Sequence, residues 1–266
     1  MKLSLCIATY NEESNIHYPL DSAYDLVDEV IIVDGGSNDK TIEKAQSYGD
    51  KVKVYNEDNP PMFHINKQKA IERARGEWIL QLDADEALSD ELKSEIKEVV
   101  RRKDVSRSTF HVSQAIAYWI PRKNFFLTRF LMKGGQYPDY TIRLYKNGVA
   151  HFPCKDVHEN VEVKGEIGYF KNPILHYADP NFTRYLTRWN RYTTLEAEQM
   201  VRARLSFLSY FVIKPKLTFL SIYFRHLGLV DGFPGFVFAL FSSIRFWAIY
   251  VKWWLKMRGL SRLSRD

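Results

Sequence analysis

The sequence contains little cysteine, and it lacks internal repeats, low-complexity segments and a long hydrophobic run near its start. Only two of its 266 residues are cysteines, Cys6 and Cys154, so a fold stapled by several disulfides is excluded. Cys6 lies in an apolar run, where a small buried thiol is expected, and nothing in the composition requires an oxidising compartment. Asn11 and Glu12 interrupt the apolar run too early for a secretory signal. We therefore expect a cytoplasmic protein.

The composition is that of a folded globular chain. Hydrophobic residues make up 45% and charged residues 26%, which excludes wholesale disorder and a polytopic membrane protein. The length predicts one large domain, or one domain with an appendage, and is sufficient for a substantial core.

Acidic residues are scarce at the C-terminal end. Residues 201–266 contain 11 Lys and Arg against 2 Asp and Glu, whereas the first 200 residues contain 27 against 30. The same 66 residues hold 15 of the 39 aromatic side chains. A basic, aromatic-rich segment is typical of a polypeptide that lies at an anionic lipid surface. Nucleic acid is the alternative partner, and we disfavour it because these aromatics recur at helical spacing rather than on a sheet or groove.

The first hundred residues alternate strand-like and helix-like segments, which is typical of a mostly parallel sheet with helices. Strands are expected at 3–8, 29–33, 52–55 and 78–82, and helices at 14–24, 37–47, 66–75 and 89–102. Short alternating stretches between 109 and 177 predict further strands, and the chain turns helical after Pro180. The predicted fold class is therefore α/β with a helical C-terminal extension.

Polar residues follow three of these expected strands, at 9–12, 34–37 and 83–85. Ligands of open α/β sheets bind beyond the carboxyl ends of the strands, so we expect these residues to converge. Asp83 and Asp85 suit Mg²⁺ or Mn²⁺, because hard cations prefer oxygen ligands and phosphate oxygens can complete the coordination. This pattern implies a diphosphate partner. The simpler alternatives are a helix cap for Asp34, a solvated turn for Asp83 and Asp85, and a tight turn for Gly35-Gly36.

Three ordered motifs carry a resemblance to a known family. They are Ile7-Ala8-Thr9-Tyr10-Asn11-Glu12, Val33-Asp34-Gly35-Gly36-Ser37-Asn38-Asp39-Lys40-Thr41, and Ala74-Arg75-Gly76-Glu77-Trp78-Ile79-Leu80-Gln81-Leu82-Asp83-Ala84-Asp85. Together they resemble the inverting family 2 glycosyltransferases, which have the GT-A fold. Three later segments, Val157-His158-Glu159, Ile174-Leu175-His176-Tyr177 and Asp231-Gly232-Phe233-Pro234-Gly235-Phe236, are similar to the bacterial subgroup with lipopolysaccharide core β-1,4-glucosyltransferases.

The resemblance implies a role for each matching side chain. The residues expected to bind the nucleotide-sugar are Thr9, Tyr10, Glu12, Asp34, Lys67, Asp83 and Arg143. Lys67 stands where the family usually has an arginine, and lysine lacks the planar two-pronged guanidinium. Arg143 is suited to the donor phosphates, and its alternative role is a surface arginine paired with Asp139. Asp85 is expected to bind the metal directly, with Asp83 near the ribose and metal.

Inverting transfer needs a base that removes a proton from the acceptor hydroxyl. By resemblance Glu159 is the first candidate and Asp156 the second, with a solvated strand residue as the alternative for Glu159. His158 would orient the carboxylate or contact the sugar. His176 is expected to pack on an apolar strand, and its alternative role is to approach the metal or phosphate.

The tail between Pro234 and Arg258 is predicted to form one helix. Arg245, Lys252 and Lys256 share one of its faces, and aromatic residues occupy the others. A spanning helix would place Arg245 in mid-membrane, so we favour a helix in the membrane plane. The alternative is a helix that packs on the catalytic domain or across a homodimer.

These observations predict a glycosyltransferase that moves a sugar from a nucleotide diphosphate sugar, preferably a UDP-sugar, to a lipopolysaccharide core or other cell-surface glycan. Residues 1–180 would form the GT-A catalytic domain, with 1–105 binding the nucleotide-sugar and 106–180 the acceptor, and 181–266 the membrane-associating or dimerising extension. The cofactor would be Mg²⁺ or Mn²⁺, and the enzyme would be cytoplasmic and peripheral on the inner face of the cell membrane. The alternatives are a sugar-phosphate nucleotidyltransferase and a non-catalytic, membrane-attached nucleotide-sugar binder.

Overall fold

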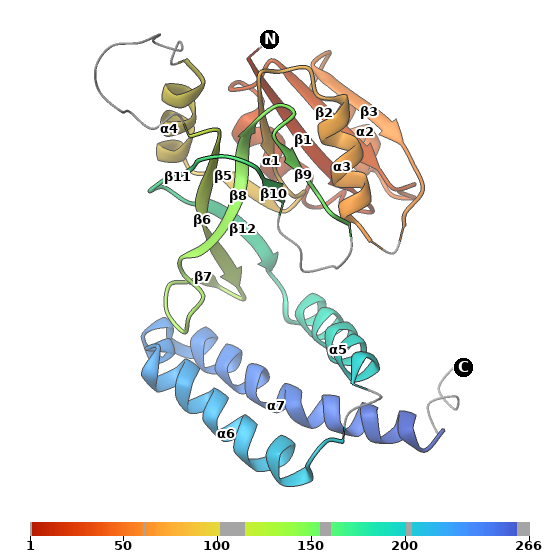
Figure 1. Cartoon of the computed structure of the whole chain (residues 1–266), viewed down its shortest axis with the longest axis vertical. Helices are drawn as coiled ribbons and strands as arrows, with labels where there is room; N and C mark the ends of the chain where they lie inside the picture. Colours follow the sequence, from red (N-terminus) through yellow and green to blue (C-terminus); the bar gives the residue numbers. More distant parts are fainter. Residues whose placement is uncertain (1, 61, 102–114, 155–160, 201–203, 260–266) are drawn as a thin grey trace. The chain divides into compact units, whose positions relative to one another are not determined.

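The computed structural model describes residues 2–60, 62–101, 115–154, 161–200 and 204–259. Its contacts form two compact units (Figure 1). Unit 1 comprises Met1–Arg122 and Asp139–His176, and unit 2 comprises Lys123–Pro138 and Tyr177–Asp266. The expected functional division at residue 180 stays a prediction.

The strands are β1 (Leu3–Thr9), β2 (Glu29–Asp34), β3 (Val52–Asn56), β4 (Trp78–Gln81), β5 (Glu86–Leu88), β6 (Ala117–Phe126), β7 (Arg129–Leu131), β8 (Asp139–Lys146), β9 (Ala150–His151), β10 (Glu162–Val163), β11 (Ile167–Tyr169) and β12 (Ile174–Asp179). The helices are α1 (His17–Ala23), α2 (Thr41–Gln46), α3 (His64–Arg73), α4 (Asp90–Arg101), α5 (Phe182–Gln199), the π-helical η1 (Ser209–Ile213), α6 (Lys214–Phe219), the π-helical η2 (Leu220–Arg225), the 3₁₀-helical η3 (Gly228–Asp231) and α7 (Gly232–Met257).

The main sheet has the strand order β3-β2-β1-β4-β8-β6-β12-β5. The first four strands are parallel neighbours, while β8 pairs antiparallel with β4 and β6, and β5 pairs antiparallel with β12. The expected α/β fold is confirmed, with a parallel N-terminal part and a helical C-terminal region. β5 is not predictable from the sequence, because this three-residue strand is held by pairing with residues 174–176, far along the chain.

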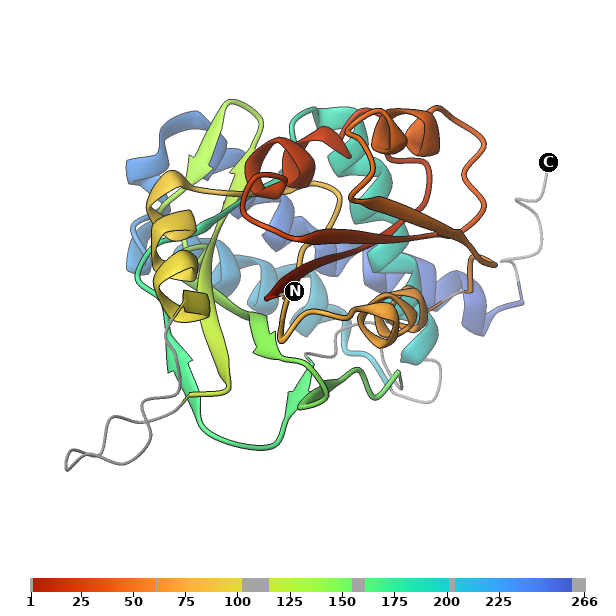
Figure 2. The same ribbon diagram turned by 90° about the horizontal axis from the view of Figure 1, so that it is seen from above.

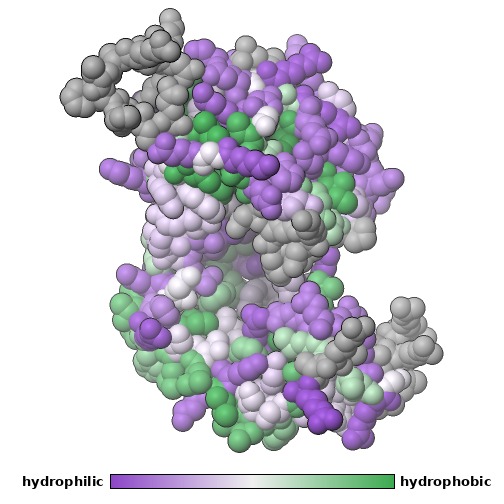
Figure 3. Space-filling model, viewed as in Figure 1, coloured by the Kyte–Doolittle hydropathy of each residue, from purple (hydrophilic) through white to green (hydrophobic). Residues whose placement is uncertain are grey.

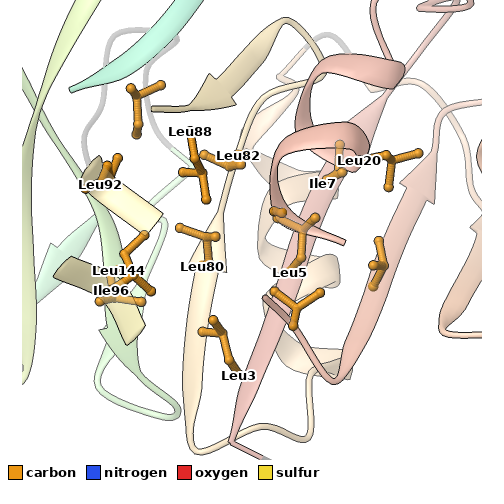
Figure 4. Packing of buried hydrophobic residues seen from close by; sticks show 14 of the residues in the cluster. Leu3, Leu5, Ile7, Leu20, Leu80, Leu82, Leu88, Leu92, Ile96 and Leu144 are labelled. Carbon is orange, nitrogen blue, oxygen red and sulfur yellow. The ribbon is translucent and has the colours of Figure 1, made fainter. Parts of the chain in front are cut away.

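The parallel strands are buried on both faces, and alternate side chains supply the two cores. Leu3, Leu5 and Ile7 of β1 pack in one cluster, and Cys6 packs in the other. Figure 4 shows the first cluster, in which these β1 residues lie near Leu80 of β4. Helices α1 and α2 cover one face of the parallel strands and α3 covers the other (Figure 2). This sandwich fixes the carboxyl ends of β1, β2 and β4 side by side.

Unit 2 is mainly helical. The long predicted helix is confirmed as α7, which contacts both α5 and α6 (Figure 1). The buried carboxylate of Asp231, just before α7, accepts hydrogen bonds from the backbone N–H groups of Met132 (3.1 Å) and Lys133 (2.7 Å). Asp231 thereby ties the start of α7 to the loop after β7. Within the described residues, Gly228–Met257 is the one helical stretch long and apolar enough to cross a membrane.

The three cations of α7 do share a face, as the sequence predicts, but that face contacts α5. Arg245 Nη2 lies 2.5 Å and 2.6 Å from the two carboxylate oxygens of Glu196. Lys252 Nζ donates to Oδ1 of Asn190 (2.6 Å) and to hydroxyls of α5, and Lys256 pairs with Glu198 at 3.3 Å. This face of α7 is therefore packed on α5 of the same C-terminal region, which takes up its charges; packing on the catalytic domain or across a homodimer stays a prediction.

Candidate functional site

The three polar strand ends lie together in unit 1. β1 lies between β2 and β4, and Thr9 at the end of β1 is in register with Asp34 at the end of β2. The Leu82 N–H, just before Asp83, donates to the Cys6 carbonyl of β1 at 3.1 Å. The order of the sheet thus brings residues from three separate segments of the sequence to one edge.

Asp34 is fully buried and organises the turn that follows β2. Its Oδ1 accepts hydrogen bonds from the hydroxyls of Thr9 (3.0 Å) and Ser37 (2.5 Å), and its Oδ2 accepts from the N–H groups of Gly36 (3.0 Å) and Ser37 (2.7 Å). Four bonds fill the acceptor positions of a carboxylate. An N–H group of a nucleobase that bound Asp34 would therefore have to replace one of these donors. Asp34 caps its own turn, while Thr41, which begins α2, bonds to Asp39.

The turn after β1 leaves Tyr10 exposed and holds Glu12 in place. The Glu12 N–H donates to the Thr41 hydroxyl at 2.8 Å, and the Glu12 carboxylate accepts from the Asn15 amide at 2.5 Å. Tyr10 is 43% exposed, so its ring is available to stack on a planar ligand. Across the turn, the Asn11 N–H donates to the Ser37 hydroxyl at 2.8 Å, which joins the β1 and β2 loops.

Gly35 and Gly36 lie in this same β2 loop. A Cβ atom on Gly35 would come within 3.2 Å of the Asn59 Cβ, and Gly36 has φ of +80°, which disfavours other residues. The glycines are therefore needed for the local turn itself.

Asp83 is the centre of a buried ion-pair network. The Lys67 Nζ of α3 lies 2.5 Å from Asp83 Oδ1, and the Arg143 Nη2 of β8 lies 2.6 Å from Asp83 Oδ2. The same Arg143 nitrogen lies 2.8 Å from Oε1 of the fully buried Glu86, and Arg143 Nη1 donates to Gln81. The Asp83 N–H also donates to Glu86 Oε2 at 2.9 Å. Two cations from different elements therefore meet the first aspartate of the motif.

A second arginine extends the network. Arg122 of β6 donates to Glu86 Oε1 at 3.2 Å and to Asp139 Oδ2 at 2.7 Å. The alternative role of Arg143, a surface arginine paired with Asp139, is thus wrong, since Arg143 is buried and Asp139 pairs with Arg122. The reason is the register of β8: Asp139 lies opposite Arg122 of β6, whereas Arg143 lies in the part of β8 that pairs with β4, where it reaches Gln81, Asp83 and Glu86.

Burial and charge shift the pKa values in this network. Burial opposes ionisation of Asp83, but Arg143 and Lys67 outweigh it and hold the pKa of Asp83 well below its usual range. Burial lowers the pKa of Lys67, and the Asp83 charge only partly offsets this. Burial also opposes the charge of Arg143, but Asp83 and Glu86 raise its pKa. The network therefore sets the cations of Lys67 and Arg143 against the carboxylates of Asp83 and Glu86.

Asp85 lies in the turn between β4 and β5 and faces His176 of β12. The His176 Nε2 lies 3.4 Å from Asp85 Oδ1, and both side chains are mostly buried. The fold therefore brings His176 to the acidic motif, and both of its predicted roles stay predictions. Among the described residues, no group of three or more His, Cys, Asp or Glu side chains is placed to hold a metal ion by itself.

Three members of this site carry no clear signal in the sequence. Glu86, Gln81 and Arg122 were not singled out, although Gln81 and Glu86 flank the Asp-x-Asp motif. Arg122 had no local signal, because its partners lie 17 and 36 residues away. Glu159 and Asp156, the candidate bases, lie outside the described residues.

Comparison with known proteins identifies the class. The family model described as glycosyl transferase family 2 matches residues 4–157, more than half of the chain. The fold is similar to that of the mannosyltransferase PcManGT from Pyrobaculum calidifontis in complex with GDP-Man and Mn²⁺, with a TM-score of 0.54, 13% identity, and coverage of 96% of this chain and 87% of that chain. The chain belongs to glycosyl transferase family 2, and it is a glycosyltransferase.

Two curated relatives match along almost their whole length. An uncharacterized glycosyltransferase of Rickettsia typhi is 29% identical over 279 residues, covering 100% of this chain and 89% of the relative. The lipopolysaccharide core biosynthesis glycosyltransferase LpsC of Rhizobium meliloti is 25% identical over 271 residues, covering 97% and 95%. The matches include the helical C-terminal region, so this region is common to the relatives.

Proposed function

We propose that the enzyme transfers a sugar from a nucleotide diphosphate sugar, preferably a UDP-sugar, to a hydroxyl of a lipopolysaccharide core or other cell-surface glycan, with inversion of the anomeric centre. The observation that carries this proposal is the juxtaposition of the Thr9–Asp34 pair with Asp83 at the edge of the parallel sheet. The lipopolysaccharide acceptor is supported by the likeness to LpsC over nearly the whole chain. An acceptor of this kind places the enzyme at the inner face of the cell membrane.

The β1 and β2 loops would bind the nucleoside. Tyr10 is exposed and can stack on the base, and Thr9 and Glu12 border the same edge. The Asp34 carboxylate would accept a hydrogen bond from a nucleobase N–H if the hydroxyl of Thr9 or Ser37 turned away from it. Arg143 and Lys67 would meet the donor phosphates, because each already places a buried positive charge beside Asp83.

Asp85, with Asp83, would hold Mg²⁺ or Mn²⁺. Their oxygens are the donor type that these cations prefer, and a site with two carboxylates leaves coordination positions for phosphate oxygens. When bound, the metal neutralises charge on the departing nucleotide diphosphate. The likeness in fold to PcManGT, whose structure holds Mn²⁺, supports this assignment. His176 would orient Asp85 through the contact between their side chains.

The acceptor proton would pass to a carboxylate in the segment 155–160. Glu159 is our first choice as the base and Asp156 the second, on the resemblance stated above. The base would deprotonate the hydroxyl as its oxygen forms the bond to the anomeric carbon and the bond to the nucleotide diphosphate breaks.

Thermal unfolding with a panel of nucleotide-sugars, with and without Mn²⁺, tests the donor assignment. A bound ligand raises the Tm, and at 100-fold excess over its Kd it adds about 2.7 kcal/mol of stability. We expect UDP-sugars to raise the Tm with Mn²⁺ present, and Asp85→Asn to abolish the Mn²⁺-dependent part. Asp90→Asn is the matched control, since the Asp90 side chain is 93% exposed and pairs with Lys93 of its own helix.

Turnover assays complete the test. Release of the nucleoside diphosphate with a lipopolysaccharide core acceptor is the expected reaction, and the product should have the anomeric configuration opposite to that of the donor. A panel in which no nucleotide-sugar changes the Tm under either condition would refute the proposed donor class.

A further inference from the structure

Unit 2 presents an apolar surface on the helical segment 207–226. Large hydrophobic side chains are exposed there at Phe207, Leu208, Val212, Ile213, Leu217, Leu220 and Phe224. Figure 3 shows hydrophobic side chains gathered over α6. A water-soluble helix normally turns such residues toward a core, so this face is unusual for a surface exposed only to water.

The π-helical turns keep these side chains in one row. From Leu208 the exposed residues follow at steps of four, five, three and four, at Val212, Leu217, Leu220 and Phe224. The mean step of four is wider than the 3.6-residue turn of an α-helix, so a regular α-helix would let the row drift around its axis. η1 and η2 have wider turns, which compensate for that drift. Buried Tyr210 and Pro215 lie on the other side, toward the protein.

The apolar surface continues onto α7 and the connection before it. Leu227, Leu229 and Val230 in the connection are exposed, and so are Phe233, Phe236, Trp247, Val251 and Trp254 of α7. α6 and α7 contact each other, so residues 204–259 form a helical hairpin with this continuous set of apolar side chains. We call this segment the helical hairpin.

The charge on the helical hairpin is almost entirely positive. Residues 204–259 contain eight Lys and Arg and a single acidic residue, Asp231, which is 1% exposed. Arg204, Lys216, Arg225 and Arg258 are exposed, so within 204–259 the hairpin shows cations and no exposed carboxylate. A surface with this charge and these aromatic rings complements anionic lipid headgroups.

The opposite side of α7 is occupied by a polar helix. Arg245, Lys252 and Lys256 bind side chains of α5, and α5 exposes polar residues such as Asn190, Arg191 and Glu198. A helix crossing the bilayer would carry this polar helix with it into hydrocarbon, where each charge is costly. The hairpin is therefore built with one apolar face and one polar face.

We propose that the helical hairpin is an interfacial anchor that lies in the plane of an anionic bilayer, with the exposed apolar row and α7 aromatics inserted and α5 toward water. The occupant of this surface is lipid, held by apolar burial and by the four exposed cations. This inference goes beyond the proposed function, because it depends neither on the donor nor on the acceptor.

Cosedimentation of the full chain with vesicles free of donor and acceptor tests the anchor. We expect strong binding to vesicles of phosphatidylcholine with one quarter phosphatidylglycerol, and binding at least about tenfold weaker to phosphatidylcholine alone. The double variant Leu217→Glu/Phe233→Glu should lose about tenfold or more of the partition into the anionic vesicles, since both side chains are highly exposed (59% and 72%). Tyr169→Glu in unit 1 is the control, because Tyr169 is equally exposed (65%) and lies outside the hairpin.

The outcomes distinguish an in-plane anchor from a membrane-crossing helix and from a dimer interface. Release of bound protein by a wash at pH 11 is expected, and retention would overturn the in-plane arrangement in favour of a crossing helix. Equal loss of binding in the double variant and in Tyr169→Glu would overturn the assignment of the hairpin. No vesicle binding, with a dimer in sedimentation velocity that the double variant dissociates, would show that a second copy covers the face instead. Donor-induced Tm shifts report on the proposed function separately.

Discussion

The ammonium of Lys67 lies 2.5 Å from Oδ1 of Asp83, and the guanidinium of Arg143 reaches the other oxygen of the same carboxylate. The pair joins α3 to the end of β4. It places a positive charge beside the acidic motif at a position where the family usually has an arginine. The Lys67 side chain is 7% exposed, and its charge lies against Asp83 and over the Phe63 ring.

Replacing Lys67 should impair donor use more than folding of the rest of the protein. We expect Lys67→Met to lower kcat/KM for the nucleotide-sugar by about 10- to 100-fold, because hydrogen bonds to charged groups contribute about 1.5–3 kcal/mol. Lys67→Arg keeps the charge and should retain more activity. Steady-state kinetics with varied donor measure both, and Lys69→Met on the same helix is the control. Activity of Lys67→Met equal to that of the control would contradict the role.

Glu86 should be essential to stability. Its buried carboxylate accepts from Arg122, from Arg143 and from the Asp83 N–H, so Glu86→Gln removes the charge that compensates two arginines. We expect a loss of about 3–5 kcal/mol in the free energy of unfolding, the cost of breaking a buried ion pair from one side. Urea unfolding measures this loss. Glu77→Gln, at an exposed position nearby, should change the stability little; matching losses in the two variants would rule out the buried network as the cause.

The depressed pKa of Asp83 predicts a specific dependence of stability on pH. In the unfolded chain Asp83 takes up a proton near pH 3.9, while in the folded chain it does so at lower pH. Its stabilising contribution is therefore complete above about pH 4 and is lost as the pH falls through the folded pKa. The difference in unfolding free energy between the wild type and Asp83→Asn should be constant from pH 7 to about pH 5 and shrink below about pH 4.

Urea titrations at several pH values test this dependence. The exposed Asp50 provides the control, and Asp50→Asn should leave the stability unchanged at each pH. A difference for Asp83→Asn that grows as the pH falls would have the wrong sign for an aspartate of lowered pKa.

Substitutions at Glu159 and at Asp156 should lower kcat to different extents. We expect Glu159→Gln to lower kcat by about 10²- to 10⁴-fold, the contribution of a general base, with a smaller change in donor KM. Asp156→Asn should have the weaker effect. The acidic limb of the pH profile of kcat should disappear in Glu159→Gln, since that limb reports protonation of the base. The opposite ranking of the two variants would assign the base to Asp156.

Much of the fold could be predicted because its signals are local. Apolar runs, turn residues and helical spacing correctly predicted β1 to β4, α1 to α4 and the long helix at the end. Short strands such as β5 could not be predicted, because three residues carry little periodicity and their state is set by a partner strand far along the chain.

The candidate site also has features that the sequence specifies and features that only the fold specifies. The sequence by itself determined which residue types follow the strands, since the pattern of apolar residues and acidic turns specifies Thr9, Asp34 and the Asp83–Asp85 motif. Only the tertiary structure decided the partners of those residues. The packing of α3 brings Lys67, and strand register brings Arg143 and Arg122, to carboxylates up to 60 residues away, and α5 takes up the charges of α7. Burial and pairing depend on contacts between distant segments, and local sequence does not encode these contacts.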